Sequence, residues 1–98
     1  AKYVAKLHNS HIVHGDLTLQ NMFYNEKKDL PIFIDFGLGF VSIKPEDFAT
    51  DIFVLKETLI AEFNKEIWFD FLETYKNNID NKETIIKLNK LEKRRKYS

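Results

Sequence analysis

The sequence predicts a small α+β fold that is mainly helical. Its 98 residues are enough for one domain with a buried core and too few for two. The composition, with 44% hydrophobic and 14% aromatic residues, is typical of a globular chain. Two short runs are rich in aromatic and β-branched residues, and three longer stretches carry apolar residues at helical spacing, which indicates strands followed by helices.

The first half of the chain predicts the end of a helix and then a hairpin. Val4 and Leu7 share one helical face, with no capping residue before them. After a short extended piece and a loop, residues 21–24 and 31–35 are typical of two β-strands joined by the polar turn at 25–30.

The second half predicts three helices. The first starts at Pro45, a residue that suits the first helical position, and the third starts near Asp80 and Glu83, which have the spacing of a capping box. We expect all three apolar faces to pack into a core, because helical apolar periodicity is mainly a burial signal. In chain order these faces comprise Phe48, Ile52, Leu55, Leu59, Ile60 and Phe63; Ile67, Trp68, Phe71, Leu72 and Tyr75; and Ile85, Leu88 and Leu91.

Charge and cysteine content narrow the classes of partner and compartment. Fifteen basic residues balance fifteen acidic ones, but residues 82–98 carry seven Lys or Arg against two Glu, so a basic tail at about 87–98 could meet a polyanion. The absence of cysteine excludes a disulfide framework and a thiolate metal site. No stretch approaches the roughly 18 apolar residues of a membrane span. We therefore expect a soluble protein of the cytoplasm or nucleus, with no membrane partner.

Polar residues in the loops around the hairpin indicate phosphoryl transfer. Asp16 and Asn21 lie five residues apart, and Asp35 ends the second strand, directly before Phe36 and Gly37. Phosphoryl transfer needs a carboxylate that orients the acceptor oxygen and further oxygen ligands that hold Mg²⁺, or Mn²⁺ as the alternative ion. Asp16 suits the first role, and Asn21 and Asp35 suit the second. A lone Asp at a strand end is more often a turn residue, so only the combination supports this interpretation.

These loops resemble those of a known superfamily. "HGDLTLQN" and "IDFG" resemble the catalytic and Mg-binding loops of protein kinases, H-R-D-x-x-x-x-N and D-F-G. Together with "EDFATDIFVLKETL", they resemble more closely the atypical serine/threonine kinases or ATPases of the KEOPS complex, the PRPK type, which serve tRNA threonylcarbamoyladenosine modification. The similarity covers most of residues 3–76. It implies a kinase-like C-lobe with a short catalytic β-hairpin and three to four helices.

The resemblance implies a role for each matching residue of the site. Asp16 matches the catalytic aspartate, and Asn21 and Asp35 match the residues that hold Mg²⁺ against the phosphates of ATP. His14, Phe36 and Gly37 match structural residues of the two loops.

Asp51 matches a helix aspartate that accepts hydrogen bonds from catalytic-loop amides and would thereby support Asp16. From spacing alone, a solvated acid in an early helix turn is an equal alternative.

Three departures from ordinary protein kinases bear on regulation. Gly15 stands where many kinases carry Arg, and Thr18 replaces a Lys that often assists the transferring phosphate. The segment between Asp35 and Asp51 is short and lacks an A-P-E motif, so we do not expect control by loop phosphorylation. The KEOPS-type kinases share the missing Arg and the short segment.

The Gly-rich loop, the strand Lys and the helix Glu of a complete kinase are missing from the sequence, so we expect a C-lobe, as a fragment or a truncated copy. The favoured function is that of a Mg²⁺-dependent ATPase or serine/threonine kinase that works with KEOPS-type subunits. Its basic tail would contact tRNA or would simply be a solvated helix end.

Two alternatives stay open. One is a non-catalytic adaptor, or truncated pseudokinase. The other is a small-molecule phosphotransferase of the aminoglycoside or choline kinase type, which also uses H-G-D but usually differs at the positions of Thr18 and Phe36.

Overall fold

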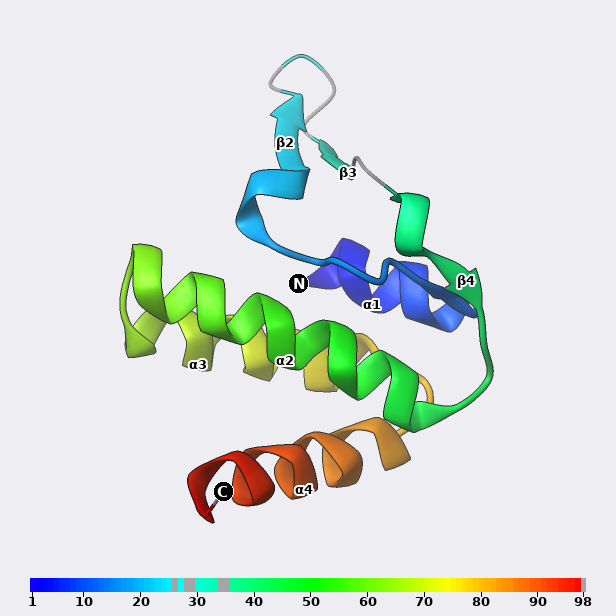
Figure 1. Cartoon of the computed structure of the whole chain (residues 1–98). Coiled ribbons are helices and arrows are strands. Elements are labelled where there is room, and N and C mark those ends of the chain that lie inside the picture. Colours follow the sequence, from blue (N-terminus) through cyan, green and yellow to red (C-terminus); the bar gives the residue numbers. More distant parts are fainter. Residues whose placement is uncertain (26, 28–29, 34–35, 98) are drawn as a thin grey trace.

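The computed structural model describes residues 1–25, 27, 30–33 and 36–97 (Figure 1). Within these residues it contains four α-helices and four short strands, which confirms the mainly helical α+β class with a hairpin. In chain order the elements are α1 (Lys2–Asn9), β1 (Ile12–Val13), the 3₁₀ turn η1 (Leu19–Asn21), β2 (Met22–Asn25), β3 (Leu30–Phe33), the 3₁₀ turn η2 (Phe36–Leu38), β4 (Phe40–Val41), α2 (Pro45–Glu62), α3 (Lys65–Asn78) and α4 (Glu83–Tyr97).

The strands form two antiparallel pairs. β2 and β3 make the predicted hairpin, with Met22 opposite Phe33. The end of its second strand at Asp35 lies outside the described residues. The pairing of β1 with β4, which places Val13 opposite Phe40, was not predicted from the sequence. This second pair holds the segment after η2 against the residues that enter the loop at 14–21, which we name the catalytic loop after the kinase loop that it resembles.

Helix α2 is central to the core and supports the catalytic loop. It crosses the middle of the molecule between α1 and α4, and it packs against α3 as well (Figure 1). Apolar side chains from all four helices and from the loop meet there, which confirms the expected core role of most of the predicted apolar faces. The buried core comprises Val4, Ala5, Leu17, Ala49, Ile52, Leu55, Leu59, Trp68, Tyr75, Ile79 and Leu88.

Two residues assigned to the core by periodicity are exposed instead. Phe63 is 63% exposed because it follows the last residue of α2, where helical spacing no longer places a side chain on the buried face. Ile67 is 41% exposed in the first turn of α3. Its backbone N–H is capped by the side chain of Asn64, and the buried face of that helix runs through Trp68 and Tyr75.

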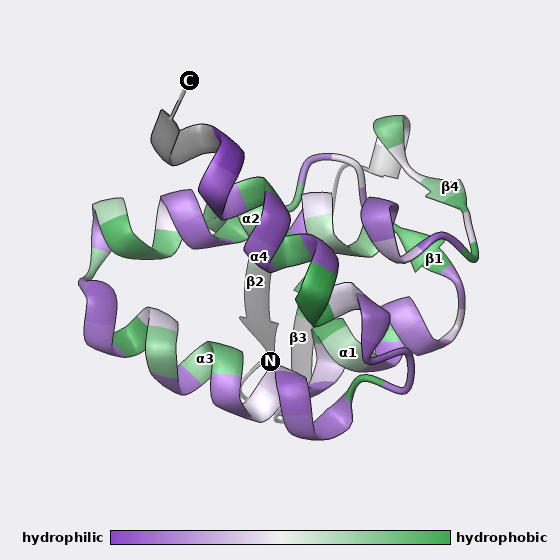
Figure 2. Ribbon diagram, turned by 90° about the horizontal axis from the view of Figure 1, so that it is seen from below, coloured by the Kyte–Doolittle hydropathy of each residue, from purple (hydrophilic) through white to green (hydrophobic). Residues whose placement is uncertain are grey.

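The last helix differs from its prediction at its start. It begins at Glu83, whose backbone N–H donates to the side chain of Asn81 rather than to that of Asp80. An Asn side chain readily forms such a local turn and so competes with a capping box. Residues 87–97 of the expected basic tail continue α4, and Leu88 is buried against the core. Figure 2 shows much of α4 in the colour of hydrophilic residues.

A short segment that starts at the last residue of η2 exposes large apolar side chains. It includes β4, which Figure 2 shows in the colour of hydrophobic residues at the edge of the molecule. The exposed side chains are Leu38, Phe40, Val41 and Ile43.

No helix in the described part of the chain is long and apolar enough to cross a membrane.

Candidate active site

The catalytic loop begins directly after β1 and passes against the backbone of η2. Gly15 has a φ angle of +88°, in the left-handed region that favours glycine. A Cβ atom at this position would lie 2.3 Å from the carbonyl oxygen of Leu38. Both the backbone conformation and this close approach require glycine where many kinases carry Arg.

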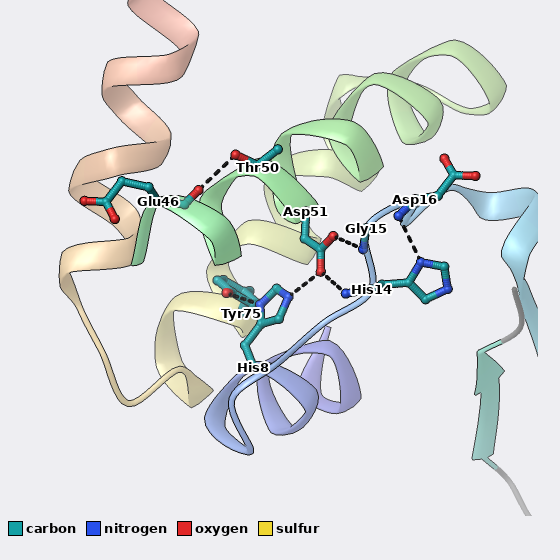
Figure 3. A network of polar contacts seen from close by, with 8 residues as sticks. All are labelled: His8, His14, Gly15, Asp16, Glu46, Thr50, Asp51 and Tyr75. Carbon is teal, nitrogen blue, oxygen red and sulfur yellow. Dashed lines mark hydrogen bonds and ion pairs between the residues drawn. The ribbon is translucent and has the colours of Figure 1, made fainter. Parts of the chain in front are cut away.

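Asp51 of α2 anchors the start of this loop (Figure 3). Its Oδ2 accepts the backbone N–H of His14 at 2.7 Å, and its Oδ1 accepts that of Gly15 at 3.0 Å. These are the loop-amide contacts that the resemblance implies for this aspartate. Asp51 is only 2% exposed, so it is not a solvated helix residue.

Two further buried residues, His8 and Tyr75, are joined to Asp51 by hydrogen bonds. Their polar role was not predicted from the sequence. Nε2 of His8 on α1 lies 2.9 Å from Oδ2 of Asp51, and Nδ1 of His8 lies 2.7 Å from the hydroxyl of Tyr75 on α3. Burial, together with the negative charge of Asp51, raises the pKa of the Tyr75 hydroxyl. The position of His8 on the buried face of a helix could have indicated a buried hydrogen bond. Tyr75 was predicted only as a packing residue.

Asp16 and Asn21 come together at the far end of the loop. The backbone N–H of Asp16 donates to Nδ1 of His14 at 3.1 Å, and the Asp16 carboxylate points away from the Asp51 network (Figure 3). Nδ2 of Asn21 donates to the Asp16 backbone oxygen at 2.8 Å and lies 3.2 Å from Oδ2 of its carboxylate. Both side chains are half-buried and are held by contacts within the loop.

Of the two predicted metal ligands, the structure describes Asn21 and not Asp35, so the metal site stays a prediction. Asn21 uses its amide nitrogen within the loop, so its Oδ1 is the atom chemically suited to Mg²⁺. Asp35 and the side chain of Phe36 lie outside the described part of the chain, and Gly37 is exposed in η2. Among the described residues, no cluster of three or more His, Asp or Glu could hold a metal by itself.

No protein-family model matches the chain, but curated relatives do. A probable bifunctional tRNA threonylcarbamoyladenosine biosynthesis protein of Methanosphaera stadtmanae is 44% identical over 96% of this chain and 17% of its own length. A probable serine/threonine-protein kinase BUD32 homolog of Archaeoglobus fulgidus is 36% identical over 98% of this chain and 49% of its own. The EKC/KEOPS complex subunit BUD32 of Enterocytozoon bieneusi is 42% identical over 74% of this chain and 34% of its own.

The chain thus spans less than half the length of each of these relatives. Two of the matches cover nearly all of the chain, so the similarity includes the segments that hold the loop and the helix with Asp51. The loop geometry and these matches lead to one conclusion: the chain belongs to the family of the KEOPS kinase-like proteins and matches one part of them.

Proposed function

We propose that this chain provides the catalytic loop of a Mg²⁺-dependent ATPase or serine/threonine kinase. We further propose that it acts with KEOPS-type subunits in the tRNA modification for which its relatives are named. One observation supports this most directly: Asp16 and Asn21 are bonded to each other at the end of a loop whose start is fixed by the buried carboxylate of Asp51. Positioning of this kind is the main contribution that a protein makes to phosphoryl transfer.

The proposed roles follow from the hydrogen bonds. The Asp16 carboxylate would orient the attacking hydroxyl or water and accept its proton. Asn21, through Oδ1, and Asp35 would hold Mg²⁺, which when bound with ATP neutralises charge on the phosphates. His14 orients the Asp16 backbone through its Nδ1 atom, and Asp51 holds the amides at the start of the loop.

The same proposal includes an RNA contact through α4. Four of its cations line a cavity of about 490 Å³ between α4 and the start of α2. They are Lys87, Lys90, Lys93 and Arg94. Clustered cations favour phosphate contacts that weaken with salt. We expect the slope of log affinity for tRNA against log salt to become shallower in a Lys90→Gln/Lys93→Gln variant, and an unchanged slope would exclude the contact.

The test is ATP turnover by the natural protein that carries this chain. Asp16→Ala and Asp35→Ala should each abolish most of the Mg²⁺-dependent turnover, because they remove the orienting carboxylate and a metal ligand. Asp70→Ala, which removes an exposed carboxylate on α3, is the matched control and should retain the parent rate. Equal rates in all four proteins would remove the proposal.

The same variants test the adaptor alternative. If Asp16→Ala and Asp35→Ala also retained binding to partner subunits and tRNA modification in cells, the chain would act as a non-catalytic adaptor. If they lost modification but kept partner binding, the catalytic function would be supported.

A further inference from the structure

Tyr75 lies far from the catalytic loop in the sequence but is joined to it by buried hydrogen bonds. Its hydroxyl is 2.7 Å from Nδ1 of His8, and the other ring nitrogen of His8 is 2.9 Å from the Asp51 carboxylate. The same carboxylate oxygen accepts the backbone N–H of His14. These contacts link α3 through α1 and α2 to the first residues of the loop (Figure 3).

The carboxylate dictates which nitrogen of His8 carries the proton. An ionised carboxylate only accepts hydrogen bonds, so Nε2 of His8 must donate to Asp51. In a neutral imidazole the other nitrogen, Nδ1, is then an acceptor. The Tyr75 hydroxyl must therefore donate to Nδ1, and the raised pKa of this hydroxyl means that it keeps its proton.

Packing places Tyr75 in this position independently of its hydroxyl. Tyr75, His8 and Asp51 are all buried, so water does not compete for their polar atoms. The Tyr75 ring meets the His8 ring edge-on and stacks on Phe71 at 6.2 Å. A phenylalanine at position 75 would keep these ring contacts and lose only the hydroxyl.

We propose that Tyr75 is a positioning residue for the catalytic loop. Its hydroxyl donates to Nδ1 and so stabilises the tautomer of His8 that Asp51 requires, with the proton on Nε2. His8 in that form holds Asp51 in the orientation that binds the amides of His14 and Gly15. The hydrogen-bond part of this inference stands alone, and only its consequence for catalysis rests on the proposed function.

The first experiment observes the tautomer directly by NMR. In ¹⁵N-labelled protein at about pH 8, well above the ordinary histidine pKa, two-bond ring correlations should show His8 protonated on Nε2 alone. In Tyr75→Phe the Nδ1 resonance should shift, because Nδ1 loses its hydrogen-bond donor, while the proton stays on Nε2 beside Asp51. Tyr3→Phe removes a hydroxyl of α1 outside this network and should leave both nitrogens unchanged.

Three results would overturn the proposal. The parent protein could show a proton on Nδ1 of His8, or on both nitrogens, and in either case Tyr75 would not be the donor. The ring resonances could also be identical in Tyr75→Phe and the parent. The first two results come from the parent protein alone, so they remain decisive if Tyr75→Phe does not fold.

The second experiment measures the consequence for ATP turnover. In Tyr75→Phe we expect kcat to fall by up to about tenfold, the size expected for one lost hydrogen bond, with KM for ATP unchanged. His8→Gln can still donate to Asp51, and in that background Tyr75→Phe should have no further effect.

A shifted Nδ1 resonance with unchanged kcat would exclude the positioning role. Failure of the proposed function would look different: Asp16→Ala and Asp35→Ala would then turn over ATP at the parent rate, whatever the tautomer of His8.

Discussion

The two ends of the catalytic loop are held in different ways. At its start, the amides of His14 and Gly15 donate to Asp51, a buried carboxylate on a helix far along the chain. At its far end, Asp16 and Asn21 bond to each other and to neighbouring loop atoms, and both are half-buried.

The contrast shows how one loop combines rigidity with accessible ligands. A hydrogen bond shielded from water is costly to break, since each group left behind stays desolvated. A half-buried side chain can instead exchange its partner for water or a bound ion at small cost. The buried end therefore supplies stability, and the half-buried end supplies the oxygen atoms available for chemistry.

The largest effect is expected from Asp51→Ala. It leaves the His14 and Gly15 amides and the ring of His8 without their buried acceptor. We expect the free energy of unfolding to fall by about 3–5 kcal/mol, as when one partner of a buried charged pair is removed. Urea unfolding measures this, and Asp70→Ala on the exposed face of α3 is the control. A loss below about 1 kcal/mol, the range for surface pairs, would contradict the distinction between the two ends.

Gly15→Ala should be next. The added Cβ would meet the carbonyl oxygen of Leu38. The alanine would also have to adopt the left-handed backbone conformation of Gly15. Together these cost about 3 kcal/mol, combining the conformational penalty with overpacking. The control is Gly39→Ala, because Gly15 is the one glycine with positive φ among the described residues. Similar urea midpoints for the two variants would show that η2 can move away from the loop.

Asn21→Ala should separate stability from activity. It removes the bonds to Asp16 at the half-buried end, so the free energy of unfolding should fall by only about 1 kcal/mol. Under the proposed function, Mg²⁺-dependent ATP turnover should nevertheless be nearly lost. Parallel unfolding and turnover measurements check this, and a large stability loss with retained turnover would reverse the assignment of the two ends.

The smallest effect is expected at an exposed carboxylate, Glu46. A hydrogen bond from its own backbone N–H and, to a lesser extent, the nearby Lys87 lower its pKa from 4.5. A lowered pKa stabilises the folded state above pH 4.5, and that contribution is lost as pH falls through the folded-state pKa. Between about pH 6 and pH 3, Glu46→Gln should therefore lose slightly less stability than the parent. A larger loss of stability in Glu46→Gln than in the parent would show that folding raises the pKa of Glu46 instead of lowering it.

Much of the candidate site could be predicted from local sequence. The spacing of Asp16 and Asn21 indicated that both belong to one site, and the structure brings the two side chains together. The family resemblance also indicated the amide contacts of Asp51. The metal-ligand role of Asp35 remains a prediction, because that residue lies outside the described part of the chain.

Features that depend on near neighbours could be predicted from the sequence alone: the hairpin, the helix that begins at Pro45, and most of the buried helical faces. These follow from periodicity and backbone chemistry, which act over a few residues. Which polar groups are buried together depends on the tertiary structure. His8, Asp51 and Tyr75 come from three helices, and β1 pairs with a strand that follows the hairpin. Such contacts depend on how the helices pack, and a local pattern of residues does not record that.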